Sequence, residues 1–154
     1  MSSLPQHHVG NQSLVRAAKL AVVIYAGLCG PNSSRAADPF LRIPQADRAV
    51  LHQVAAEYRL TAEQRRLLFA IRIVEWGGPG REMGVLHPHA MRFAKDPRQS
   101  LLTQARWAAG TIRRRYNGDL AEFARRWCPL TDSRDKRNLN KNWLPNVRRL
   151  MAGR

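Results

Sequence analysis

Apolar residues recur at steps of three and four along the chain from residue 44 onward, and this spacing constrains the fold more than any other feature. Segment 44–60 carries such a stripe, made of Val50, Leu51, Val54, Ala55 and Tyr58. A stripe of this kind is typical of an amphipathic helix. No segment shows the strict apolar–polar alternation of a half-buried strand. The sequence therefore predicts an all-α domain.

Local start and stop signals divide the rest of the chain into further helices. Thr61 followed by Gln64 has the spacing of a capping box, so a helix should begin there and run to about Trp76. Asp96 followed by Pro97 predicts the start of a long helix. That helix should end at Asn117-Gly118 and bury a stripe made of Leu101, Ala105, Ala108, Ile112 and Tyr116.

Two shorter helices are expected after the long one. Asp119 should cap a helix that runs through Trp127 and stops before Pro129. Segment 143–151, WLPNVRRLM, should form the last helix. The segments 77–95 and 131–142 are expected to be irregular loops, because they are rich in turn-forming and polar residues.

One carboxylate lies on the apolar face of the helix that begins at Thr61. With Gln64 at zero on a helical wheel, Leu68 and Ile71 fall at roughly 40° and 340°, and Glu75 falls between them at roughly 20°. The arginines at positions 65, 66 and 72 fall on the opposite side, where we expect water. Phe69 and Ile73 lie on that side too, so we expect the helix to be covered on more than one side. Glu75 is therefore predicted to point inward at the end of its helix.

An inward-facing carboxylate at this place has a chemical use. Burial disfavours the charged form and raises the pKa, and a carboxylic acid that stays protonated can act as a general acid. The glycines at 77, 78, 80 and 84 would leave backbone open to a ligand beside it. The alternative is a structural ion pair of Glu75 with Arg72 or Arg81.

The N-terminal segment has the order of a secretory signal. Arg16 and Lys19 precede an apolar run from Leu20 to Cys29, and small residues follow up to Ala36. We therefore expect residues 1–36 to be a signal peptide, with residues 37–154 exported to the periplasm, the cell envelope or the extracellular space. A buried or amphipathic N-terminal helix is the alternative.

The charge of the chain indicates a class of partner. Its 26 Lys and Arg against 11 Asp and Glu give a net charge of +15, which attracts polyanions such as nucleic acid, anionic lipid or cell-wall polymer. His87 and His89 lie in a loop without a matching third metal ligand, and Cys128 is the single cysteine left after the leader. We expect no metal and no cofactor.

Several short motifs appear in an order that is similar to the lysozyme-like superfamily, in particular its lytic transglycosylases and glucosaminidases. Glu75 resembles the catalytic Glu that closes a buried helix, and GVLHP, residues 84–88, resembles the turn that follows it. QARWAAGTIRRRYNGDLAEFARRWCP, residues 104–129, resembles the long helix and the next helix of that family. NLNKNWLPNVRRLM, residues 138–151, is similar to the terminal helix of the glucosaminidase branch.

The resemblance implies cleavage of peptidoglycan glycan strands, with Glu75 as the general acid and base. Glu82, in the following loop, is a possible second carboxylate, and a solvent-facing loop charge is its alternative. Residues expected to bind the sugar chain are Trp76, Gly84, Val85, His87, Trp127 and Trp143. The expected partners are glycan strands and the anionic wall surface, with no specific nucleic acid and a monomeric state.

Two other functions remain open on the sequence alone. A basic helical module could bind nucleic acid through its paired arginines, although this leaves the leader and Glu75 unexplained. A lysozyme-like domain without activity could hold glycan and cut nothing.

Overall fold

The computed structural model describes residues 38–85, 92 and 95–153, so the predicted signal peptide, His87 and His89 lie outside the described part. Within the described residues the regular secondary structure is entirely helical, with no strand, as the sequence predicts. The elements are η1 (Pro39–Arg42), α1 (Gln45–Glu57), α2 (Ala62–Glu75), α4 (Pro97–Arg115), α5 (Leu120–Trp127), η2 (Asn140–Asn142) and α6 (Trp143–Met151). None of these helices is long and apolar enough to cross a lipid bilayer.

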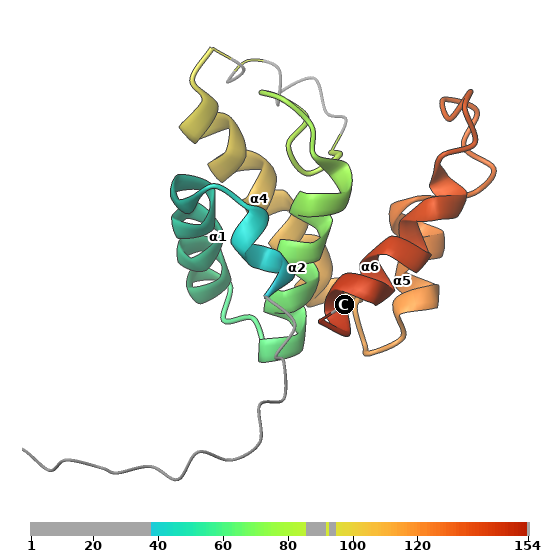
Figure 1. The fold of residues 1–154 in the computed structure, drawn as a ribbon, viewed down its shortest axis with the longest axis horizontal. Helices are drawn as coiled ribbons and strands as arrows, with labels where there is room; N and C mark the ends of the chain where they lie inside the picture. Colours follow the sequence, from blue (N-terminus) through green and yellow to red (C-terminus); the bar gives the residue numbers. More distant parts are fainter. Residues whose placement is uncertain (1–37, 86–91, 93–94, 154) are drawn as a thin grey trace, which may run out of the picture. The chain divides into compact units, whose positions relative to one another are not determined.

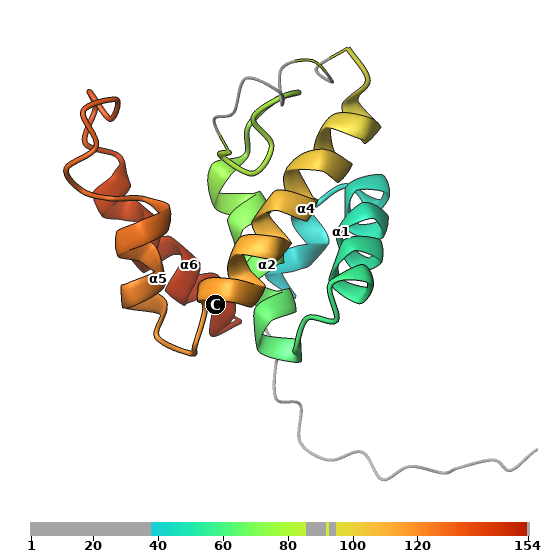
Figure 2. The same ribbon diagram turned by 180° about the vertical axis from the view of Figure 1, so that it is seen from behind.

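Helix α2 lies at the centre of the described helices (Figures 1 and 2). It packs against α1 and α4 on one side and against α6 on another, while α5 packs on α6. The core that these contacts enclose includes Leu51, Leu67, Leu68, Ile71, Ala105, Ile112, Phe123 and Val147. Helix α2 is therefore held between the helices on either side of it.

The predicted helix starts are confirmed by their hydrogen bonds. The backbone N–H of Gln64 donates to Thr61 Oγ1 at 3.2 Å, and the backbone N–H of Thr61 donates to Gln64 Oε1 at 3.1 Å, which completes the capping box. Asp96 accepts from the backbone N–H of Gln99 at 3.1 Å, with Pro97 as the first helical residue. Asp119 caps α5 in the same way.

The predicted buried stripes are also confirmed. The side chains of the α4 stripe, and those of Val50, Leu51, Val54 and Ala55 on α1, are all buried. Tyr58, at the end of α1, is partly buried and packs against the same core. The three- and four-residue spacing thus identified the faces on which α1 and α4 meet α2.

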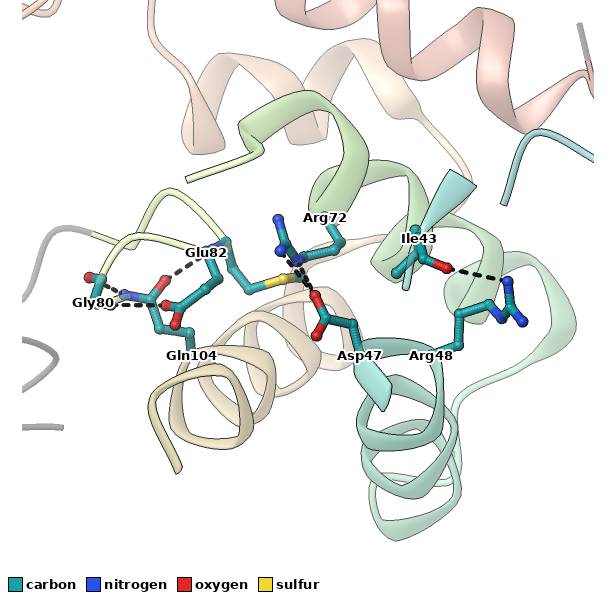
Figure 3. Close-up of polar contacts among 8 residues, drawn as sticks. Ile43, Asp47, Arg48, Arg72, Gly80, Glu82 and Gln104 are labelled. Carbon is teal, nitrogen blue, oxygen red and sulfur yellow. Dashed lines mark hydrogen bonds and ion pairs between the residues drawn. The ribbon is translucent and has the colours of Figure 1, made fainter. Parts of the chain in front are cut away.

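Arg72 is a correction to the helical wheel. Predicted to face water, it is 8% exposed, and its Nη2 lies 2.8 Å from Asp47 Oδ2 on α1 (Figure 3). The wheel was wrong here because α2 is covered on more than one side, and α1 supplies a carboxylate that compensates the buried guanidinium. The guanidinium also lies over the ring of Trp76, 5.3 Å from its centre. Arg72 is thus paired with Asp47 and does not pair with Glu75.

Candidate active site around Glu75

Glu75 is the last residue of α2, and the local sequence explains its position. It follows the buried Ile71 by one helical turn, so its side chain leaves the helix on the inward face. Trp76 then adopts a left-handed backbone conformation, with φ of 38°, and ends the helix. The chain turns there into the glycine-rich loop 77–85. The side chain of Glu75 is partly buried, in agreement with the wheel.

Two indole groups bind the same carboxylate oxygen. Trp127 Nε1, at the end of α5, donates to Glu75 Oε1 at 3.1 Å, and Trp143 Nε1, at the start of α6, donates to it at 2.9 Å. Oε2 has no hydrogen-bond partner within the described residues. Oε1 is therefore the acceptor oxygen, and Oε2 is free to carry a proton.

The two indoles are held in place by one buried phenyl ring. Phe123 is 1% exposed and stacks on Trp127, with ring centres 5.5 Å apart. It also lies 6.3 Å from the ring of Trp143 and packs edge-on against Tyr116 at 5.8 Å. Aromatic packing of this kind restricts the orientation of each ring. The hydrogen-bond donors that face Glu75 are thus positioned by the core.

Gly84 lies directly against the carboxyl group. A Cβ atom at this position would lie 2.4 Å from both Cδ and Oε2 of Glu75, which is far inside van der Waals contact. The φ of Gly84 is +69°, in the region that disfavours side chains. The backbone of the loop can therefore approach the acid this closely only because position 84 is glycine.

A buried glutamine anchors this loop to α4. Gln104 is fully buried, and its Nε2 donates to the carbonyl of Gly80 and, at 3.0 Å, to that of Val85. Its Oε1 accepts from the backbone N–H of Met83 at 3.0 Å. Glu82 contributes from within the loop, since its Oε2 accepts from the backbone N–H of Gly80 at 3.0 Å (Figure 3). These bonds fix the loop that carries Gly84.

The Gln104→Leu variant is expected to lose roughly 2–3 kcal/mol of unfolding free energy, because the loop groups that it binds would be left buried and unpaired. Urea denaturation measures this loss. Gln99→Leu is the matched control, since Gln99 lies on the same helix and its side chain makes no hydrogen bond within the described residues. Equal stability of the two variants would contradict an anchoring role for Gln104.

The pKa of Glu75 is raised above its ordinary value. Burial is the main cause, because it disfavours the charged form. The hydrogen bonds from Trp127 and Trp143 act in the opposite direction, since they stabilise the carboxylate, but they do not outweigh burial. The carboxyl group therefore favours its neutral form. Its anion, once formed, would accept hydrogen bonds from the indole N–H groups of Trp127 and Trp143.

Glu75 lines two adjoining cavities, which we call together the Glu75 groove. The larger, of about 570 Å³, is lined by Glu75, Gly77, Arg81, Gly84, Val85, Trp107, Thr111, Arg115, Phe123, Arg126, Trp127, Cys128, Pro129, Asp132, Arg134 and Asn140. The smaller, of about 490 Å³, is lined by Val74, Glu75, Cys128, Asp132, Arg134, Asp135, Leu139, Asn140, Asn142, Trp143 and Asn146. Because five lining residues are shared, an elongated ligand could pass Glu75 from one cavity to the other.

Two other titratable groups of the groove, Asp132 and Cys128, also have shifted pKa values. Asp132 is bound by Arg134 at 2.6 Å, and this hydrogen bond lowers the pKa of Asp132 to about 2, so it is ionised. Burial, with Glu75 and other carboxylates nearby, raises the pKa of the Cys128 thiol to about 12, so it stays protonated at neutral pH. Cys128 is therefore unsuited to act as a nucleophile, and Glu75 is the groove residue with the character of an acid.

The structure brings several of the predicted site residues together. Glu75, Gly84, Val85 and Trp127 line the larger cavity, and Trp143 lines the smaller one. Trp143 is only 4% exposed, so it offers its indole N–H to Glu75 and has no free face for a sugar ring.

Two predicted residues, Trp76 and Glu82, stand apart from this group. Trp76 is 58% exposed and lines neither cavity, because its ring is turned onto Arg72. Glu82 is buried in the loop anchor and also lines neither cavity. His87 lies outside the described residues.

Other residues of the groove were not singled out from the sequence. Trp107 and Arg115 reach the larger cavity from α4, and Asp132 and Asn140 reach both cavities from the loop after α5. The amide of Asn140 donates to the carbonyl of Pro129 at 2.7 Å and thereby folds that loop back on itself. No spacing rule marks these positions, because the loop and α4 lie close to Glu75 only in the folded chain.

Within the described residues there is no group of three or more side chains suited to hold a metal ion. Comparisons of the chain with protein-family models, with curated proteins and with solved structures found no match.

Proposed function

We propose that this protein cleaves the glycan strands of peptidoglycan, with Glu75 as general acid and then general base. One observation carries the proposal: a carboxyl group with a raised pKa lines a groove, while two indole N–H groups bind one of its oxygens and leave the other free. The resemblance of the sequence motifs to lytic transglycosylases and glucosaminidases points to the same chemistry.

In the proposed reaction, the protonated Oε2 of Glu75 donates its proton to the oxygen of the glycosidic bond. The bond between that oxygen and the anomeric carbon breaks, the leaving sugar keeps the proton, and positive charge develops on the other sugar. As the proton leaves, negative charge spreads to Oε1, where the hydrogen bonds from Trp127 and Trp143 become charge-assisted and stronger. The indoles thus stabilise the carboxylate at the moment it forms.

The second half of the reaction returns the proton to Glu75. Its carboxylate accepts a proton either from water or from a hydroxyl of the sugar itself, whose oxygen then bonds to the anomeric carbon. This scheme needs one carboxylate. If a second takes part, the geometry favours Asp132, which is ionised and lines both cavities, over Glu82, which lines neither.

The proposal is tested by incubating the purified protein with peptidoglycan and identifying the soluble products by mass spectrometry. Release of muropeptides by the wild type, absent with Glu75→Gln, is the expected result. Hydrolysis adds one water at each cleaved bond. Formation of an anhydro sugar adds none, so its product is lighter than the hydrolysis product by the mass of one water. Peptidoglycan binding without product, or salt-sensitive DNA binding that Glu75→Gln leaves unchanged, would instead support the two other functions.

The pH dependence of cleavage should follow the ionisation of Glu75. Activity requires the protonated acid, so it falls as pH rises through the pKa of Glu75. Trp127→Phe removes a hydrogen bond that lowers this pKa, so the alkaline limb of the pH–rate profile should move to higher pH. The control is Trp76→Phe, since Trp76 neighbours Glu75 in sequence and lines neither cavity. An unchanged limb in Trp127→Phe would mean that another group is the acid.

The remaining expectations fit this proposal. An exported, strongly basic domain would be retained at an anionic cell wall, where its substrate lies, through the charge that the sequence shows. We accordingly place the protein in the periplasm, the cell envelope or the extracellular space and expect it to act as a monomer.

A further inference from the structure

We propose that the Glu75 groove selects glycan strands that carry carboxylate groups over uncharged strands with the same sugar backbone. This inference rests on the proposed function and names the substrate class of the same site. It follows from the charges that line the groove.

Four arginines line the larger cavity, and they come from different parts of the fold. Arg81 lies in the loop after α2, Arg115 at the end of α4, Arg126 on α5 and Arg134 in the loop after α5. Four separate segments thus each contribute one positive charge. The exposed face of a single helix would not produce this arrangement.

Two of these arginines have no counter-charge of their own. Arg126 is paired with Glu122 at 3.3 Å, and Arg134 is paired with Asp132. Arg81 and Arg115 have no ion-pair partner among the described residues. A guanidinium group offers several donors that match a carboxylate in geometry and charge. Arg81 and Arg115 are therefore available to an anionic ligand.

The arginines do not serve the acid itself. A cation close to a carboxyl group lowers its pKa. The pKa of Glu75 is nevertheless raised, and it is governed by burial and the two indole hydrogen bonds, with no contribution from a guanidinium. We therefore assign the arginines to substituents of the sugar chain and not to the acid.

Two kinds of carboxylate occur on such strands. The lactyl group of alternate sugars ends in a carboxylate when no peptide is attached, and an attached stem peptide carries carboxylates of its own. Chitin oligomers have a similar β-1,4-linked backbone of N-acetylated sugars and no charge. Comparing these three substrates therefore separates recognition of charge from recognition of the backbone.

The test measures kcat and KM on soluble peptide-bearing strands, on strands stripped of peptide and on chitin oligomers of similar length. We expect kcat/KM on at least one carboxylate-bearing substrate to exceed that on chitin by about tenfold or more, with the preference falling at high salt. Arg115→Gln and Arg81→Gln should each raise KM on that substrate about tenfold and raise KM on chitin by a clearly smaller factor. Preference for peptide-bearing strands assigns the contact to the stem peptide, and preference for stripped strands assigns it to the lactyl carboxylate. Equal use of both means that the arginines accept either carboxylate.

Arg125→Gln is the matched control, because it removes the same charge from α5 at a residue that lines neither cavity. Equal kcat/KM on chitin and on both carboxylate-bearing substrates would overturn the inference and leave the proposed function intact. It is also overturned if Arg115→Gln and Arg81→Gln behave like Arg125→Gln, since the general positive charge would then account for the preference.

A wild-type protein that cleaves none of the three substrates removes the proposed function, and this inference with it. Thermal unfolding monitored by circular dichroism verifies that each variant is folded.

Discussion

The Glu75→Gln variant is expected to cleave glycan strands about 10³-fold more slowly than the wild type, because general acid catalysis of this kind contributes on that order. Glutamine has nearly the same shape as glutamic acid and cannot donate a proton to a leaving oxygen. Its amide oxygen can still accept from the indoles of Trp127 and Trp143, so the surrounding structure should be retained. Initial rates of muropeptide release measure the effect.

Stability measurements separate this loss of activity from a loss of fold. Since burial raises the pKa of Glu75, the native state holds its proton more tightly than the unfolded state does. The resulting stabilisation is complete below the unfolded pKa of a glutamic acid and is lost as pH rises through the raised pKa. Glutamine does not titrate. The unfolding free energy of the variant, relative to the wild type, should therefore increase as pH rises over that range.

Urea denaturation at several pH values measures this difference. Activity of Glu75→Gln within about threefold of the wild type would contradict the role of Glu75, because a missing general acid costs far more. A large loss of stability at every pH would assign Glu75 a structural role instead.

The Gly84→Ala variant is expected to lose about 10²-fold or more in cleavage rate, because misplacing a catalytic group by about 1 Å has this effect. The added methyl group would lie on the carboxyl group of Glu75 and push it away from its indole donors. A side-chain end can move at low cost, so the loss of stability should stay near 1–2 kcal/mol, the cost of alanine in a left-handed conformation. Steady-state rates and urea denaturation measure the two effects.

Gly118→Ala provides a matched control for the backbone. Gly118 also has a positive φ, of +100°, but no atom lies within 4 Å of the position that its Cβ would take. Both variants thus carry the strain of a left-handed alanine, and Gly84→Ala alone collides with the acid. If the two variants lose activity equally, contact between Gly84 and Glu75 is not what positions the acid.

The helices could be predicted well because their signals are local. The capping box at Thr61, the Asp96-Pro97 start and the stripe along α4 each depend on residues within a few turns of one another. Arg72 was misplaced because the exposure of a helix face depends on what packs against it, and its partner Asp47 lies on another helix. The wheel also places Phe69 and Ile73 on the arginine side and so indicates a second covered face, but it cannot show that Arg72 lies within that face.

The site was predictable to a lesser extent. The wheel identified Glu75 as inward-facing, since its direction depends only on α2. The donors to its carboxyl group lie 52 and 68 residues further along the chain, on helices whose packing no local pattern specifies. For the same reason the sequence favoured Trp76, the neighbour of Glu75, although it lines neither cavity, and it did not single out Asp132 and Arg115.

By itself, the sequence determined that the chain is helical, where its helices begin, and that one carboxylate lies on an apolar face. These properties follow from periodicity and capping, which act over a few residues. The tertiary structure alone decided that two indoles meet on Oε1 of Glu75, that Gly84 closes against Oε2 and that arginines from four segments line one cavity. Such contacts join distant parts of the chain, and the packing of α4 and α6 against α2, and of α5 against α6, brings them together.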